Sequence, residues 1–226
     1  MSLTRNALSL FSTCEISDAL IKLGIPHGGH IPDINRICLE APKNKSICGP
    51  AFTVQMVLTS DKSAPKLENH FVDQAEAGAV MVIDAPPHAK NAVWGGLMTA
   101  GAQARGVFGV IISGRCRDLA EHDAAGFAVF ARGHSTLGQS PFTRPSAVNV
   151  PLTIRPQPFD SELLPVTIEP GDMMVADADG VVCVPELLVE DVVEMAKKGR
   201  EVDERCKRDI EAGFGVQATF KKHRGK

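Results

Sequence analysis

The sequence predicts an α/β fold with a parallel βαβ unit, added antiparallel strands and a projecting C-terminal helix. Two apolar segments flank a helix of small residues that opens at Gly95 and Gly96: residues 79–84, which end in the acid Asp84, and residues 107–112. Continuous apolarity, rather than alternation, indicates strands that are covered on both faces, as in parallel sheets. The 226-residue chain has no Tyr, one Trp and ten Phe. Its core must therefore be mainly aliphatic, which favours packed α/β layers.

Apolar spacing and an N-cap predict two helices within residues 1–24. The first spans residues 3–11, and the second begins at the capping residue Ser12. The Pro- and Gly-rich loop that follows contains His27 and His30. We interpret these as polar loop residues rather than a metal pair, since the sequence places no third ligand near them.

The first half of the core is expected to be built from long segments. Residues 47–58 have the β-branched, apolar character of a buried strand, and residues 65–77 are predicted to be a helix. The helix of the βαβ unit spans residues 97–105 and ends at Gly106. A strand, a helix and a strand at this spacing are typical of two parallel strands joined by a crossover.

The second half is expected to add shorter, antiparallel strands. Turn residues separate apolar segments there, which is typical of hairpins. The two turns are residues 170–172 and 177–180. The strands predicted in this half are residues 128–131, 147–150, 163–168, 173–176 and 181–184.

A highly charged helix is predicted over residues 185–212, with Gly213 as its stop. Its apolar positions become sparse after Lys197, so we expect it to project and to pack on a neighbouring subunit. The basic cluster at residues 221–226 is expected to be a frayed, solvated tail, with phosphate binding as the lesser alternative. Residues 1–226 are expected to form a single domain.

Composition excludes several classes of protein. The formal net charge is -3, so no basic surface predicts nucleic-acid binding. No apolar run reaches the ~18 residues that a membrane-spanning helix needs. The six cysteines include no C-x-x-C pair, and the N-terminus lacks a secretory pattern. We therefore expect a reduced, cytoplasmic protein.

Polar residues gather where the two parallel strands are expected to end. The helix start at Gly96 would offer free N–H groups to a carboxylate, and Arg117, Asp118 and Glu121 follow the second strand. This set suits a 2-oxo acid, with Arg117 stabilising an enolate and Asp118 holding a metal. Oxygen ligands favour Mg²⁺ or Mn²⁺. The alternative is that Arg117 and Asp118 form a structural pair that caps a loop.

The spacing of these residues resembles a known pattern. Gly96, twenty residues, Arg117-Asp118, two residues and Glu121 match the G-x20-R-D-x2-E/D pattern of the RraA-like family. Other segments are similar to that family in the same order: residues 11–20, 47–54 and 170–181. Any one of these matches is weak evidence, but together with the Gly96 to Glu121 pattern the four in order are quite specific.

The resemblance implies a fold and an activity. The fold would be the family's swivelling-domain sandwich. The activity would be that of a class II pyruvate aldolase, acting on a substrate like 4-hydroxy-4-methyl-2-oxoglutarate and also decarboxylating oxaloacetate. The assembly would be a homotrimer or a pair of trimers, that is, a hexamer.

The resemblance also implies roles for individual residues. Asp118 would bind the metal directly, Arg117 would stabilise the enolate, and Glu121 would contact the metal through water. An acid from the neighbouring subunit's C-terminal helix would complete the site, and Glu201, Asp203 and Glu204 remain open for this role. The backbone contacts to the substrate carboxylate would come from Gly96, Leu97, Met98 and Thr99.

Other interpretations of single residues are weaker. Lys66 and Lys90 are interpreted as surface lysines rather than Schiff-base nucleophiles. Cys116 lies between two arginines, which would lower its pKa, but a buried small residue is the preferred interpretation. His122 is open as a proton donor or as a residue that orients the site.

A function of another class is a non-catalytic regulator, because the RraA-like family is named after a protein that binds and inhibits an RNA-degrading enzyme. A pure binding module has no chemical need for Gly96, Arg117, Asp118 and Glu121 together. The sequence therefore favours the enzyme, while the aldol half of its substrate stays open.

Overall fold

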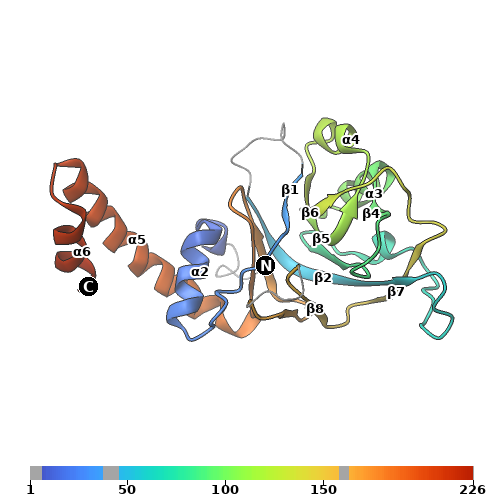
Figure 1. Ribbon diagram of the computed structural model, residues 1–226, viewed down its shortest axis with the longest axis horizontal. Helices are drawn as coiled ribbons and strands as arrows, with labels where there is room; N and C mark the ends of the chain where they lie inside the picture. The colour runs from blue at the N-terminus through green and yellow to red at the C-terminus, as the bar shows by residue number, and fades with distance from the viewer. Residues whose placement is uncertain (1–6, 38–45, 158–162, 226) are drawn as a thin grey trace.

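The computed structural model describes residues 7–37, 46–157 and 163–225. A body built on β-sheet carries two C-terminal helices that extend away from it (Figure 1). Residues 3–6 of the helix expected over residues 3–11 lie outside the described residues; of the rest, Ala7 and Leu8 are helical and residues 9–11 form a turn. The helices are α2 (Thr13–Lys22), η1 (Phe71–Gln74), α3 (Gly96–Ala104), α4 (Leu119–Ala124), η2 (Glu186–Leu188), α5 (Val189–Glu211) and α6 (Val216–Arg224).

One large sheet and one small sheet form the body. The strands are β1 (Asn35–Arg36), β2 (Ile47–Leu58), β3 (Val80–Asp84), β4 (Ala92–Trp94), β5 (Gly109–Cys116), β6 (Ala128–His134), β7 (Thr143–Val148), β8 (Leu152–Ile154), β9 (Val166–Ile168), β10 (Met173–Ala176) and β11 (Val181–Val184). The large sheet has the order β1-β6-β5-β3-β2-β10-β11, with β4 beside β5 and β7 beside β2. Strands β8 and β9 pair separately.

The predicted βαβ unit is confirmed. β3 and β5 are parallel neighbours, in register from Val80 opposite Gly109 to Asp84 opposite Ser113. Strand β5 runs through Cys116, four residues beyond the predicted end at Ile112. The extension arises from tertiary pairing, because β4 and the end of β6 both pair with residues Arg115 and Cys116.

The two faces of the parallel strands bury different cores. On one face, Ile83 of β3 and Ile112 of β5 pack with α3, η1 and the side chain of Trp94. On the other face, Val82 and Ile111 pack against β8, β9 and the β10–β11 hairpin. Alternation of side chains along each strand explains the division. The predicted α/β class with added antiparallel strands is confirmed.

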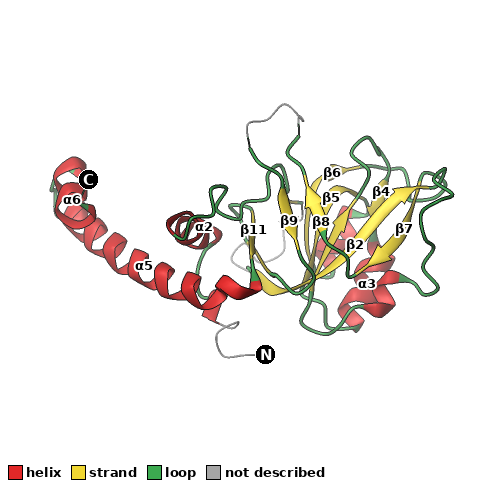
Figure 2. Cartoon of the chain, turned by 90° about the horizontal axis from the view of Figure 1, so that it is seen from below, coloured by secondary structure: helices red, strands yellow, loops and turns green. Residues whose placement is uncertain are grey.

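A third cluster attaches the helices to the hairpin. Apolar residues of α2 and α5 cover the outer face of β10 and β11, as the side view shows (Figure 2). The antiparallel hairpin expected around residues 177–180 is confirmed, with Met173 opposite Val184. The strands predicted over residues 147–150 and 163–168 appear with shifted bounds, as β7 and β9, whereas β8 was not predicted.

The helix predicted over residues 65–77 is wrong. Only the short η1 forms there, and the rest of the segment is irregular. The Nδ1 atom of His70 accepts a hydrogen bond from the Val72 N–H at 3.3 Å and so caps η1. Phe71 and Val72 are buried under α3, and this packing outweighs the helical spacing of the segment.

The frayed tail expected over residues 221–226 is also wrong. Residues as far as Arg224 belong to α6, which packs back on α5. Lys222 and His223 both contact the carboxylate of Asp209, at 2.9 and 2.7 Å, and Arg224 contacts Asp203 at 2.6 Å. These contacts between helices order a segment whose composition alone predicts fraying. Within the described ranges, no helix has the length and apolarity needed to cross a membrane.

One ion pair joins the two ends of the chain. Glu15 completes a capping box with Ser12 at the start of α2, and its carboxylate also accepts two hydrogen bonds from Arg200 of α5, at 2.6 and 2.8 Å. The Arg200 guanidinium stacks over the Phe11 ring, 4.3 Å from its centroid. The hydrogen bonds from Arg200 lower the pKa of Glu15 to about 2, and those from Ser12 act in the same direction.

We predict that Glu15→Gln lowers the free energy of unfolding by about 1 kcal/mol at pH 7. The folded-state pKa lies below the ordinary value of 4.5, so this stabilisation is present above pH 4.5 and is lost as the pH falls towards 2. Urea unfolding at fixed protein concentration should show the difference between wild type and variant shrinking over that range. The exposed Glu76→Gln serves as control, and a difference that does not change with pH would contradict the prediction.

Candidate active site

The predicted site residues come together at the end of β5. The N–H of Arg117 donates to the carbonyl of Trp94 at 3.0 Å, which holds the chain as it leaves the strand. Asp118 then turns the chain into α4 with φ 61° and ψ 44°, in the left-handed region. That conformation costs a non-glycine residue about 1 kcal/mol or more. Such strain is typical of functional positions, and here it fixes where the carboxylate lies.

The Asp118 carboxylate lies at the N-terminus of α3. Its Oδ2 atom accepts a hydrogen bond from the Gly96 N–H at 3.0 Å and lies 3.4 Å from Nε of Arg117. The side chain of Asp118 is 33% exposed, and its Oδ1 atom has no partner among the described residues. The start of α3 therefore already accommodates a carboxylate, as expected for the positive end of a helix.

Two glycines make room for the acidic side chains. A Cβ atom on Gly95 would lie 2.6 Å from Oδ2 of Asp118, and a Cβ on Gly96 would lie 1.6 Å from Oε2 of Glu121. Both distances are shorter than any real contact. Gly95 has an extended backbone, with φ -154°, and so does not need to be glycine for its conformation. Because Gly95 and Gly96 have no side chains, the Asp118 and Glu121 carboxylates can lie close to the start of α3.

Arg117 presents its guanidinium to the same place. Its side chain is 47% exposed, and a Cβ on Gly138 would lie 2.8 Å from its Nη1. Beyond the contact with Asp118, the guanidinium has no partner within the described part of the chain. Only Nε contacts Asp118, so the Nη1 and Nη2 donors are available to a ligand.

The four residues expected to bind a substrate carboxylate lie in the first turn of α3. Gly96 and Thr99 are buried, Met98 is partly buried, and Leu97 is 82% exposed. Thr99 cannot present its side chain to a ligand, because its hydroxyl accepts from Nε1 of Trp94 at 2.9 Å. Contacts from this turn would therefore come from the backbone.

A buried polar pair joins α3 to α4. The Thr99 hydroxyl also contacts Nδ1 of His122 at 2.9 Å, and both side chains are fully buried. Burial lowers the pKa of His122, and the backbone of Arg117 and the acids around it act in the opposite direction. The contact between Thr99 and His122 is enclosed between the two helices that border the site. Cys116 is likewise fully buried, in agreement with its interpretation as a small core residue.

The oxygen donors fit a hydrated divalent cation better than a closed metal cage. Among the described residues, no three His, Cys, Asp or Glu side chains gather around one point, the two loop histidines included. Asp118 and Glu121 instead place two exposed carboxylates at adjacent glycines. Mg²⁺ keeps several waters and is held by one or two carboxylates together with substrate, so it fits this donor set.

The three acids considered for the neighbouring site lie on α5. Glu201, Asp203 and Glu204 belong to the part of that helix that projects away from α3 and α4 (Figure 1). Asp203 is engaged by Arg224, whereas the side chains of Glu201 and Glu204 form no ion pair within the described ranges. None of the three acids can serve the site of its own chain.

The sequence does not predict two residues of the site, Trp94 and Gly138, and predicts only part of the role of Gly95. Gly95 is expected to open the helix and to let an anion approach the backbone, and in the structure it also makes space for Asp118. Trp94 holds both Arg117 and Thr99, and Gly138 supports the guanidinium. The sequence carries one signal for Trp94, since it is the only tryptophan and directly precedes the paired glycines.

The chain is similar to several known proteins. A model of the RraA-like family, described as Aldolase/RraA, matches residues 13–183. A protein of Halalkalibacterium halodurans that carries the provisional name 4-hydroxy-4-methyl-2-oxoglutarate aldolase is 33% identical over 168 residues, which are 74% of this chain and 73% of the relative.

Two solved structures share the fold. An uncharacterized protein of Pseudomonas syringae pv. tomato is 30% identical, with a TM-score of 0.79 and 96% of each chain covered. RraAS2 of Streptomyces coelicolor, described as an unusual member of the RNase ES inhibitor RraA protein family, has a TM-score of 0.76 at 22% identity. It covers 90% of this chain and 95% of its own, and at that identity it shows the fold alone.

The left-handed conformation of Asp118 generates a prediction about stability. We expect Asp118→Gly to be more stable than Asp118→Ala by about 1 kcal/mol, because both lose the carboxylate but only glycine adopts this backbone without strain. Urea unfolding of the two variants measures the difference.

The matched control is the same pair of substitutions at Arg205, which lies exposed in the middle of α5. There the sign should reverse, with glycine less stable than alanine by about 1 kcal/mol. Equal stability of the two Asp118 variants would show that the backbone is not strained.

Proposed function

The chain belongs to the RraA-like family, and from that premise we propose that it is a metal-dependent carbon–carbon lyase that releases pyruvate from a 2-oxo acid. The substrate would be oxaloacetate or an aldol such as 4-hydroxy-4-methyl-2-oxoglutarate. One observation carries the proposal. The Asp118 carboxylate and the Arg117 guanidinium are held together at the N-terminus of a helix, both partly exposed, and Nη1, Nη2 and Oδ1 have no partner among the described residues.

Each group has a task in this chemistry. The free N–H groups in the first turn of α3 would bind the substrate carboxylate, and the partial positive charge of the helix end would favour it. Cleavage of the C3–C4 bond, one carbon away from the keto group, would release CO₂ from oxaloacetate, or a second carbonyl compound from the aldol once its hydroxyl loses a proton. Either reaction leaves the enolate of pyruvate, whose negative charge the Arg117 guanidinium would stabilise. Asp118, and Glu121 through water, would hold the cation. When bound, Mg²⁺ or Mn²⁺ would supply a Lewis acid for the keto oxygen.

His122 and Thr99 would support this arrangement without touching the substrate. Their hydrogen bond ties the helix that binds the carboxylate to the helix that follows Asp118. Buried contacts of this kind restrict the relative position of two elements. A fixed separation between the helix start and the Arg117–Asp118 turn is what a bidentate substrate requires.

We further propose that the site is completed in a homotrimer or a pair of trimers. The projecting α5 leaves Glu201 and Glu204 free of ion pairs, within the described residues, and far from the site of their own chain. An acid on that helix could act only on a neighbouring copy. Glu201 and Glu204 are now favoured over Asp203, which is engaged by Arg224.

The first functional prediction concerns pyruvate release. With Mg²⁺ present, the protein should decarboxylate oxaloacetate faster than Mg²⁺ does without protein, and EDTA should abolish the difference. Arg117→Ala should lower kcat by about 10² or more, because it removes charge stabilisation of the enolate. Asp118→Ala should abolish the metal-dependent rate. Coupling to lactate dehydrogenase measures pyruvate directly.

Arg105→Gln serves as control, because Arg105 lies at the far end of α3 and contacts only a backbone carbonyl. Its rate should equal that of the wild type. No metal-dependent rate above the protein-free blank, or an unchanged rate in Asp118→Ala, would contradict the lyase and favour a non-catalytic regulator. The same assay with 4-hydroxy-4-methyl-2-oxoglutarate tests the aldol half of the substrate.

The second functional prediction concerns the space above Gly96. In Gly96→Ala the new Cβ would displace the Glu121 carboxylate, which can rotate into solvent at little cost in stability. We expect kcat/KM to fall at least about tenfold, because small displacements of catalytic groups are costly.

Gly101→Ala is the matched control in the same helix. Its Cβ would lie 3.1 Å from a methyl group of Val72, away from the acids. We expect its kcat/KM to be that of the wild type. Full activity in Gly96→Ala would mean that Glu121 plays no part in the site.

A further inference from the structure

A second polar cluster lies at the carboxyl ends of the parallel strands, on the face opposite to α3. The apolar positions of that face end in a polar residue on each of three adjacent strands. Val80 and Val82 are followed by Asp84 in β3, Ile111 by Ser113 in β5, and Ala128 and Phe130 by Arg132 in β6. Ligands of parallel sheets bind beyond these strand ends.

The three polar residues are linked to one another. Nε of Arg132 donates to Oγ of Ser113 at 3.3 Å, and the Ser113 side chain lies close enough to Asp84 to act on its pKa. The Arg132 side chain is only 9% exposed and also contacts Asp33 at 3.3 Å. Burial raises the pKa of Asp84 to about 6, against the hydrogen bonds from Ser113 and Gln55. The negative charges that act on Arg132 are therefore those of Asp33 and Asp84.

A small cavity opens over this cluster. It measures about 70 Å³ and is lined by Lys90, Ser113, Arg115 and Arg132, with Pro86 and Gln157 among its other walls. No acidic side chain among the described residues lines it. A water molecule occupies about 30 Å³ in the liquid, so the cavity can hold roughly two waters or one carboxylate or phosphate group.

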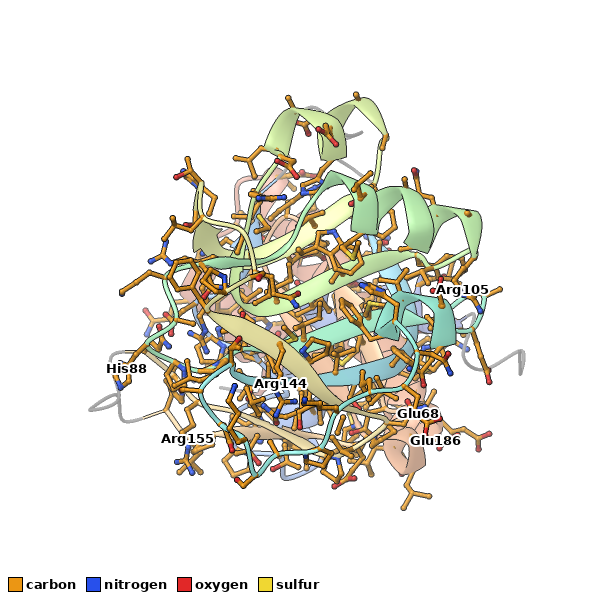
Figure 3. All side chains as sticks on the ribbon, turned by 90° about the vertical axis from the view of Figure 1, so that its right-hand side faces the viewer. Glu68, His88, Arg105, Arg144, Arg155 and Glu186 are labelled. Carbon is orange, nitrogen blue, oxygen red and sulfur yellow. The ribbon has the colours of Figure 1, made fainter. Side chains whose placement is uncertain are left out.

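Two of the lining cations have no counter-charge. Arg115 donates to the His134 carbonyl at 3.0 Å, and its Nη1 lies over Gly133, where a Cβ would come to 3.2 Å. Within the described ranges, neither Arg115 nor Lys90 forms an ion pair. The Arg155 carbonyl accepts a hydrogen bond from Arg132. Arg155 and His88 both lie on the left of the view in Figure 3. The region therefore has a local excess of positive charge in a chain whose net charge is -3.

We propose that this cavity binds a small oxyanion, the carboxylate or phosphate group of a metabolite, through the side chains of Lys90 and Arg115. Arg132 forms the floor of the site, held in place by Ser113 and Asp33. Charged guanidinium and ammonium donors in a confined space bind such groups through charge-assisted hydrogen bonds. The site is separate from the Asp118 site, since the sheet lies between the cavity and α3.

The test measures binding of inorganic phosphate to the full chain by ³¹P line broadening, in metal-free buffer of low ionic strength. We expect saturable binding with a Kd of about 1 mM or tighter, and displacement by acetate if the site also takes carboxylates. Lys90→Gln and Arg115→Gln should each weaken binding at least about fivefold. Asp84→Asn should tighten it about threefold, because it removes a nearby negative charge. A merely structural role of Asp84 would not produce that gain.

Matched controls separate this site from general charge effects and from the candidate active site. Lys66→Gln changes an exposed lysine without a partner, and Arg105→Gln changes an arginine that, like Arg115, contacts one carbonyl. Both should bind phosphate as the wild type does, and so should Asp118→Gly. Three outcomes would overturn the proposal: no saturable binding, equal losses in the controls, or a loss only in Asp118→Gly. Lys90 is exposed, so Lys90→Gln remains a valid test if Arg115→Gln does not fold.

Discussion

The pairing of β5 is the constraint on which both polar regions of this protein depend. The strand lies between β3 and β6 as far as Ser113, and β4 replaces β3 as its neighbour at Arg115 and Cys116. It therefore stays extended as far as Cys116, and Arg117 is still fixed by the Trp94 carbonyl. The chain must then reverse within one residue to begin α4. The left-handed Asp118 makes that reversal, so the backbone rather than a flexible side chain sets the position of the carboxylate.

The same strand ends carry opposite chemistry on their two faces. Towards α3, glycines and a helix N-terminus surround the acids Asp118 and Glu121, which suits a cation and an anionic substrate together. Towards β8 and β9, Arg115 and Lys90 border a cavity that suits an anion alone. Ser113 and Arg115 lie within β5 and line the cavity, whereas Arg117 and Asp118 follow the strand, and the turn into α4 places Asp118 at the N-terminus of α3. Two sites of different character can therefore lie close together without sharing residues.

The sequence allowed the βαβ unit and the Gly96, Arg117, Asp118 and Glu121 constellation to be predicted, because buried parallel strands and helix starts leave strong local patterns. The end of β5 could not be predicted, since Ser113, Gly114 and Arg115 have no strand-like pattern and become extended only through their neighbours. The same holds for α6, whose basic residues are ordered by Asp203 and Asp209 of another helix. A spacing pattern also contains no backbone angles, so it could place Asp118 beside the helix but could not reveal its strain.

At three positions of the site, the residue type is not the one that the backbone conformation alone would favour. At Asp118 the backbone is left-handed, where glycine would be the least strained choice, yet an acid is present. At Gly95 the backbone is extended and at Gly96 it is helical, where almost any residue would fit and glycine is unfavourable by up to about 1 kcal/mol. Stability alone would exchange these choices. The acid at the strained position 118 and the glycines at the relaxed positions 95 and 96 have the same effect. Together they place two carboxylates at a helix N-terminus, open to solvent. That is the arrangement expected when chemistry, rather than folding, determines the residues.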